Sequence, residues 1–179
     1  MSSRPAPDLV APSVRLHDAF LEAYHEWGPG PHEDGFGLHP EDDVETAAGF
    51  AAWVSRLTRA EDPSADPGPG RVHCTYRWIV EDDQIQGGID LRHELTDERL
   101  RSLGHIGYGV RPSARRRGLA TWALGEMLGE ARARGLPRVL IVCEAGNIAS
   151  IRTIEHWGAV AEPAEEDAPT RRYWIELSR

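Results

Sequence analysis

Apolar residues recur along the chain at helical spacing in several segments, and this period predicts where the helices lie. Three long segments carry one continuous apolar face, namely residues 13–27, 40–59 and 120–135. Two shorter helices are expected at 97–103 and 149–157, and a glycine directly after the second suits a helix end. The pattern therefore predicts helices in both halves of the chain.

Strands are expected where apolar and polar residues alternate or where apolar residues run together. The segments are 8–12, 72–80, 85–93, 105–110, 138–143, 159–162 and 171–177. The second and third are joined by a short polar stretch, which is a hairpin pattern. A predicted helix separates 105–110 from 138–143, so these two strands should run parallel to each other.

Length and composition limit the classes of function. A chain of 179 residues is most simply a single domain over residues 1–179. No apolar run approaches the roughly 18 residues that cross a bilayer, and the first residues lack the apolar part of a secretory signal. We therefore expect a cytoplasmic protein without membrane contact. Cys74 and Cys143 lie in apolar runs without metal-ligand spacing, which predicts buried, reduced thiols and no metal site.

The charges are distributed unevenly along the chain. The net charge is −9, yet seven arginines and only two glutamates fall within residues 111–138. One basic segment in an acidic protein suits an anionic cofactor together with a cationic acceptor. Nucleic acid is disfavoured as a partner because binding the phosphate backbone needs a basic face rather than one basic turn.

The basic segment begins where the strand 105–110 gives way to the third long helix. Three consecutive arginines and Gly118 stand at this turn, where the first backbone N–H groups of the helix have no intrahelical partner. Free N–H donors, the positive end of the helix dipole and a missing Cβ together suit a bound diphosphate. A surface loop without a ligand and a nucleic-acid patch are the alternative interpretations.

At this turn the sequence resembles a known family. The pattern Arg115-x-x-Gly118-x-Ala120, after a strand ending Val-Arg-Pro, is similar to the acetyl-coenzyme A signature of the GNAT superfamily of N-acetyltransferases. A second pattern, Asn147-x-x-Ser150 after an apolar strand, resembles the next segment of that superfamily in order and spacing. The resemblance extends over residues 73–179 and fades over residues 1–70.

The resemblance implies a fold and a donor substrate. The fold would be α/β (α+β), a mixed, mostly antiparallel sheet of about six to seven strands flanked by helices and splayed where the cofactor lies. Acetyl-coenzyme A would be the acyl donor, no metal would be needed, and a homodimer is common for this fold type. The implied cofactor-binding residues are Val110, Arg115, Arg116, Arg117, Gly118, Leu119, Ala120, Thr121 and Asn147.

The catalytic groups are less clear. The superfamily commonly places a tyrosine acid seven residues after the matching asparagine, and here Ile154 occupies that place. Tyr108 on the central strand is a candidate acid, with Tyr173, a water or no dedicated acid as alternatives. His105 at the start of the central strand and Glu94 at the end of its neighbour are the candidate bases. Glu144 is a further candidate base, and Cys143 lacks a cationic neighbour that would make it a nucleophile.

The function predicted from these patterns is acetyl transfer from acetyl-coenzyme A to a primary amine of a small molecule or peptide, by direct attack in a ternary complex. One alternative is a module that binds coenzyme A or senses acyl-coenzyme A without turnover. Another is an acyltransferase that uses a different donor or acts on a protein N-terminus. The acceptor pocket would be built by the N-terminal helices and loops, where no motif identifies it.

Overall fold

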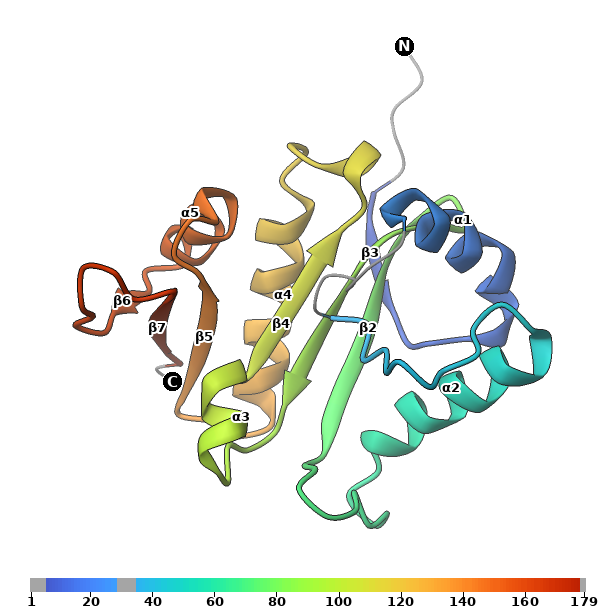
Figure 1. Ribbon diagram of the computed structural model, residues 1–179, viewed down its shortest axis with the longest axis horizontal. Helices are drawn as coiled ribbons and strands as arrows, with labels where there is room; N and C mark the ends of the chain where they lie inside the picture. The colour runs from blue at the N-terminus through green and yellow to red at the C-terminus, as the bar shows by residue number, and fades with distance from the viewer. Residues whose placement is uncertain (1–5, 29–34, 178–179) are drawn as a thin grey trace.

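The computed structural model describes residues 6–28 and 35–177 (Figure 1). The elements follow one another as β1 (Asp8–Val10), α1 (His17–Trp27), α2 (Ala47–Ala60), β2 (Cys74–Glu81), β3 (Gln84–Arg92), α3 (Glu98–Leu103), β4 (Ile106–Val110), α4 (Leu119–Ala133), β5 (Arg138–Glu144), α5 (Ile148–His156), β6 (Val160–Ala161) and β7 (Thr170–Glu176). Short 3-10 turns at Val14–Leu16 and Pro112–Ala114 precede α1 and α4.

The strands form two antiparallel sheets within the described part of the chain. One has the order β1-β2-β3-β4 and the other the order β5-β7-β6. The predicted class, a mostly antiparallel fold flanked by helices, is confirmed, with the strands divided between two sheets rather than joined in one. β4 and β5 lie side by side and point the same way in Figure 1, as the intervening helix predicts, yet no ladder joins them.

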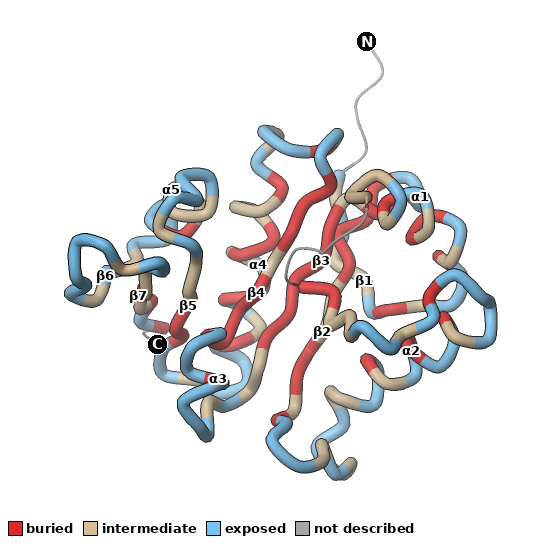
Figure 2. Tube along the Cα trace, viewed as in Figure 1, coloured by how far each residue is buried: buried red, intermediate tan, exposed pale blue. Residues whose placement is uncertain are grey.

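Helices cover both faces of the larger sheet because its strands alternate apolar residues between two cores. Trp78 on β2 belongs to the core that α1 and α2 cover, whereas its neighbour Ile79 belongs to the core under α4. The first core is rich in aromatic rings, with Phe20, Phe50 and Trp53 around Trp78. In Figure 2 the buried strands run through the middle of the molecule between these layers.

Two local features show how the sequence sets the element boundaries. Asp82 and Asp83 take positive φ values of 48° and 59° between β2 and β3, the geometry of a tight hairpin turn. The helix predicted from residue 40 begins only at Ala47, which corrects that boundary. Thr46 is the N-cap, because its side-chain oxygen accepts the backbone N–H of Gly49 at 3.1 Å.

Candidate active site

The separation of the two sheets leaves a cavity of about 810 Å³ between β4 and β5. Its walls are all of β4, the end of β5, the first residues of α5 and the turn that leads into α4. We call this cavity the groove. α4 connects β4 of the larger sheet to β5 of the smaller one (Figure 1). Its first turn follows β4 closely in the chain and lies at one end of the groove.

Backbone groups of β4 face the groove in alternation. Arg92 N–H donates to His105 O at 2.7 Å and Arg111 N–H donates to Gln86 O at 2.8 Å, so odd-numbered residues of this segment bond to β3. The intervening residues Ile106, Tyr108 and Val110 therefore turn their N–H and C=O groups toward β5. An extended ligand lying in the groove can pair with this strand edge.

The turn at the start of α4 suits an anion. The first N–H groups of any α-helix have no intrahelical partner. In α4 the N-cap is Gly118 at φ +78°, and no side chain caps these groups. A Cβ added at Gly118 would meet no atom within 4 Å, so the approach to these N–H groups is open. Leu119, Ala120 and Thr121 line the groove at this end. The turn therefore fits the diphosphate that the sequence pattern predicts there.

The three arginines of the turn have different surroundings. Arg115 and Arg116 line the groove, and Arg115 Nε donates to Val110 O at 3.0 Å. Arg117 instead donates to both carboxylate oxygens of Glu81 at 2.7 Å and does not line the groove. The structure therefore brings two of the three predicted arginines to the groove and places Arg117 against the β2–β3 hairpin.

Asn147 lines the groove from the opposite wall. Its side-chain oxygen accepts Ser150 N–H at 3.0 Å and so caps α5. The amide NH₂ group of the same side chain stays available to donate to a ligand. Helix capping and ligand binding are therefore compatible at this residue.

Two of the predicted catalytic residues line the groove, Glu144 at the end of β5 and Tyr108 on β4. The Tyr108 hydroxyl donates to Ser150 O at 3.4 Å, which places the hydroxyl between β4 and α5. Ile154 is fully buried in the core under α4. Tyr173 is also buried, does not line the groove, and burial raises the pKa of its hydroxyl. These positions favour Tyr108 among the candidate acids.

Cys143 is half-buried and lines the groove, which corrects the expectation of a thiol buried in the core. Burial raises the pKa of its thiol, and the negative charges of Glu144 and Glu155 raise that pKa further. A thiol held in its protonated form is a poor nucleophile. Cys74 is fully buried, as predicted.

His105 and Glu94 lie outside the groove and outside the second cavity described below. His105 joins the two sheets, because its backbone N–H donates to Leu140 O at 2.7 Å and its ring Nδ1 accepts Leu140 N–H at 2.9 Å. Burial, with smaller contributions from Arg92 and Arg138, lowers the pKa of this imidazole to about 4. Glu94 is exposed beyond the end of β3. Neither placement favours a role as the base.

The lowered pKa of His105 predicts how stability depends on pH. The unfolded chain takes up a proton near pH 6.5, whereas the folded chain takes it up only near pH 4. The free energy of unfolding should therefore fall as pH decreases through this window, by at most about 3 kcal/mol. His105→Asn keeps an acceptor for Leu140 N–H but does not titrate, so it should reduce this slope. Urea denaturation at several pH values measures it, and an identical slope in both proteins would contradict the assignment.

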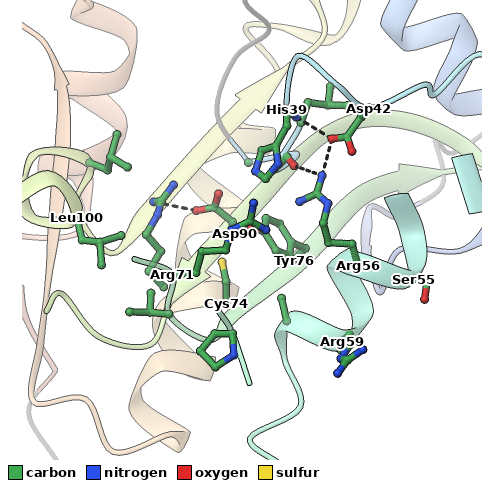
Figure 3. A pocket seen from close by; sticks show the side chains of 18 of the residues that line it. His39, Asp42, Ser55, Arg56, Arg59, Arg71, Cys74, Tyr76, Asp90 and Leu100 are labelled. Carbon is green, nitrogen blue, oxygen red and sulfur yellow. Dashed lines mark hydrogen bonds and ion pairs between the residues drawn. The ribbon is translucent and has the colours of Figure 1, made fainter. Parts of the chain in front are cut away.

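A second cavity, of about 1280 Å³, lies over β2 and β3 between α2 and α3 (Figure 3). We call it the upper cavity. Its floor includes Tyr76 on β2 and Asp90 on β3, and its rim is formed by α2, α3 and the segments around residues 35–42 and 66–72. α2 and the segment around residues 35–42 contribute to this cavity, and its use by the acceptor stays a prediction.

Asp90 connects the two cavities. Its carboxylate is 3% exposed, accepts Gly107 N–H at 3.1 Å and forms an ion pair with Arg92 at 3.3 Å. Asp90 lines the upper cavity and Gly107 lines the groove. Asp90 was not among the site residues predicted from the sequence. The available signal was an acid between Ile89 and Leu91 in an apolar strand, where burial requires a partner.

Comparison with known proteins identifies the family to which this arrangement belongs. A model of the acetyltransferase (GNAT) domain matches residues 14–160. The chain belongs to the GNAT acetyltransferase family. The matched range includes the turn at Gly118, both walls of the groove and the floor of the upper cavity. The predicted enzyme class, an acyltransferase of the N-acetyltransferase type, is confirmed by this membership.

Solved structures of other GNAT proteins share the fold at low sequence identity. The microcin C7 self-immunity acetyltransferase MccE, in complex with acetyl-CoA and AMP, is 13% identical with a TM-score of 0.66, over 98% of this chain and 93% of that one. The ribosomal L7/L12 alpha-N-protein acetyltransferase RimL, in complex with coenzyme A, is 14% identical with a TM-score of 0.66, over 98% and 95%. An N-acetyltransferase from Staphylococcus aureus Mu50 is 16% identical with a TM-score of 0.63, over 97% and 99%. At such identities the likeness shows the fold alone.

Two further observations on this GNAT protein concern metal ions and membranes. Across residues 6–28 and 35–177, no three His, Cys, Asp or Glu side chains gather as metal ligands. Among the same residues, every helix is too short or too polar to cross a bilayer. A homodimer, a cytoplasmic location and a single domain over the whole chain stay predictions.

Proposed function

We propose that this GNAT protein transfers the acetyl group of acetyl-coenzyme A to a primary amine by direct attack, with both substrates bound together. The observation that supports the proposal most strongly is the hydrogen bond from the backbone N–H of Gly107, which lines the groove, to the carboxylate of Asp90, which lines the upper cavity. The groove presents an anion-binding turn and a strand edge for the donor. The upper cavity presents a carboxylate for the amine, and Gly107 N–H links that carboxylate to the groove.

On the donor side, the diphosphate of acetyl-coenzyme A would bind the free N–H groups at the start of α4, with Arg115 and Arg116 beside it. The pantetheine arm would lie along the backbone groups of Ile106, Tyr108 and Val110. The Asn147 amide would donate to it from the other wall. This placement would bring the thioester to the end of the groove near Gly107.

The residues around the thioester suit acyl transfer to an amine. Backbone N–H groups of β4 that face the groove would polarise the thioester carbonyl. The Tyr108 hydroxyl would supply a proton to the leaving thiolate. Asp90 forms an ion pair with Arg92 and would attract the ammonium form of the acceptor, then orient the neutral amine once its proton has passed to water. Positioning and electrostatics would supply most of the rate enhancement.

A turnover assay tests this proposal. Thiol release from acetyl-coenzyme A would be followed with a panel of primary amines, including polyamines, amino acids, aminoglycosides and short peptides with free N-termini. We expect thiol release above the rate of hydrolysis only when a suitable amine is present. Acetyl-coenzyme A binding without amine-dependent release on any member of the panel would support a binding or sensing module instead.

A further inference from the structure

We propose that the acceptor amine belongs to a molecule that also carries an anionic group, a carboxylate or a phosphate, which Arg71 and Arg99 bind at the rim of the upper cavity. The inference rests on the proposed acetyl transfer, since it names the class of acceptor for the same site. The observations that support it are the charges that line the upper cavity and the contacts that each charged group already makes.

The lining of the upper cavity has the opposite charge from the protein as a whole. Five arginines and three aspartates line it, whereas the chain carries a net charge of −9. The lining residues are Arg56, Arg59, Arg71, Arg92 and Arg99 with Asp42, Asp66 and Asp90. A concave surface of one sign raises the local concentration of ligands of the other sign. The acid-rich composition suggested a cationic acceptor, and this lining favours an acceptor with negative charge as well.

Contacts within the protein neutralise two of these arginines. Arg56 forms an ion pair with Asp42, and Arg92 forms one with Asp90, as Figure 3 shows for the first pair. Within the described residues, Arg59, Arg71 and Arg99 form no ion pair with a carboxylate. The Arg59 charge still lowers the pKa of Asp62, so Arg59 is partly compensated. Arg71 and Arg99 are therefore the cations that a bound anion would pair with.

Arg71 and Arg99 lie at the same part of the rim of the upper cavity. The Arg99 guanidinium donates to the carbonyl oxygen of Gly70, the residue that precedes Arg71. His39 lines the same cavity as Arg71. Burial, followed by the charge of Arg56 and a smaller contribution from Arg71, lowers the pKa of that imidazole. Two guanidinium groups at one rim match the oxygen atoms of a phosphate or carboxylate.

The upper cavity therefore has two ends of different charge. Asp90 lies at the floor beside β4, where the amine must be to meet the thioester. Arg71 and Arg99 lie at the rim, on the segment after α2 and on α3. Figure 3 shows Arg71, His39 and Asp90 around the same cavity. An acceptor with an ammonium group and an anionic group satisfies both ends at once.

The test compares matched acceptors that differ in the anionic group. One pair is O-phosphoethanolamine and ethanolamine, and the other is the C-amidated peptides Ala-Glu-Glu and Ala-Gln-Gln. With acetyl-coenzyme A saturating, kcat/KM should be at least about tenfold higher for an anionic member than for its neutral partner. Equal values, or a preference for the neutral members of both pairs, would overturn the proposal. The pair that shows the difference separates a small phosphate ester from an acidic peptide.

Arginine variants connect the preference to the proposed residues. The double variant Arg71→Gln/Arg99→Gln should remove the preference, about a tenfold to hundredfold loss for the anionic acceptor, and leave the neutral acceptor unchanged. Both side chains are exposed, so the fold should persist. Arg132→Gln, which changes an exposed arginine on α4 outside both cavities, is the matched control and should keep the preference. A preference that survives the double variant would overturn the assignment to these residues.

An equilibrium measurement separates this inference from the proposed function. Protein saturated with coenzyme A, so that the diphosphate site is filled, would be titrated calorimetrically with O-phosphoethanolamine and with the anionic peptide. Binding of either that the double variant loses would support the anion site even if no amine is acetylated. Turnover of neutral amines, without binding or turnover of either anionic probe, would overturn the anion site while the transferase function stands.

Discussion

Replacing Gly118 by aspartate is expected to raise the dissociation constant of acetyl-coenzyme A by at least about a hundredfold, or about 2.7 kcal/mol. The carboxylate would stand beside the free N–H groups of α4, where it competes with the diphosphate and repels it. A Cβ at this position meets no atom within 4 Å, so the substitution leaves the packing intact. Isothermal titration calorimetry measures the effect directly.

Two controls isolate the charge from the backbone strain. Gly135→Asp places the same side chain at φ +83°, again with no atom within 4 Å of the added Cβ, but at the far end of α4. It should therefore share the strain and keep the affinity for acetyl-coenzyme A. Gly118→Asn adds a neutral side chain that tolerates positive φ, and it should lose less affinity than Gly118→Asp. Micromolar binding retained by Gly118→Asp would contradict the diphosphate assignment.

Replacing Asp90 by asparagine should impair both stability and turnover. The change leaves the Arg92 guanidinium, which is 16% exposed, without its counter-charge, and breaking a buried ion pair in this way costs about 3 kcal/mol. Urea denaturation measures that loss. In the fraction that stays folded, kcat should fall at least about tenfold while the affinity for acetyl-coenzyme A is kept, because the groove does not include Asp90.

Glu94→Gln is the matched control for Asp90→Asn. Glu94 is exposed and lines neither cavity, so this change should alter the free energy of unfolding by less than about 0.5 kcal/mol and leave turnover nearly unchanged. A larger loss of kcat in Glu94→Gln than in Asp90→Asn would support the base first predicted from the sequence. It would also remove Asp90 from the proposed mechanism.

The turn at the start of α4 could be predicted from the sequence because its determinants are local. The strand, the glycine and the helix follow one another, and the helical period after Gly118 fixes which N–H groups are free. Asn147 was predicted through the resemblance to the GNAT superfamily, and the residue lines the groove while its side chain caps α5. Local signals of this kind are reliable wherever one short segment supplies the whole feature.

The roles of Arg117, His105 and Asp90 depend on partners far away in the sequence. Arg117 pairs with Glu81, His105 accepts from Leu140 N–H, and Asp90 accepts from Gly107 N–H. A run of three arginines does not show which one faces a ligand, and a strand-end histidine does not show whether a second sheet will cover it. These placements follow from tertiary packing, which no local pattern encodes.

The start of α2 was predicted too early because two local signals for a helix start compete in this segment. The acidic residues after Pro40 suit the first turn of a helix, so the helix was placed there. Thr46 provides a better N-cap, and Asp43 accepts the Thr46 hydroxyl at 2.7 Å, which stabilises a turn before the helix begins. The segment before Thr46 instead contributes His39 and Asp42 to the upper cavity.

The crystal structure of the protein with acetyl-coenzyme A tests the central claim most directly. We predict that the diphosphate lies against the N–H groups at the start of α4, that the pantetheine arm pairs with the edge of β4 facing β5, and that the thioester lies near Gly107, within reach of the upper cavity. Acetyl-coenzyme A bound elsewhere, or a pantetheine arm outside the space between β4 and β5, would contradict the account.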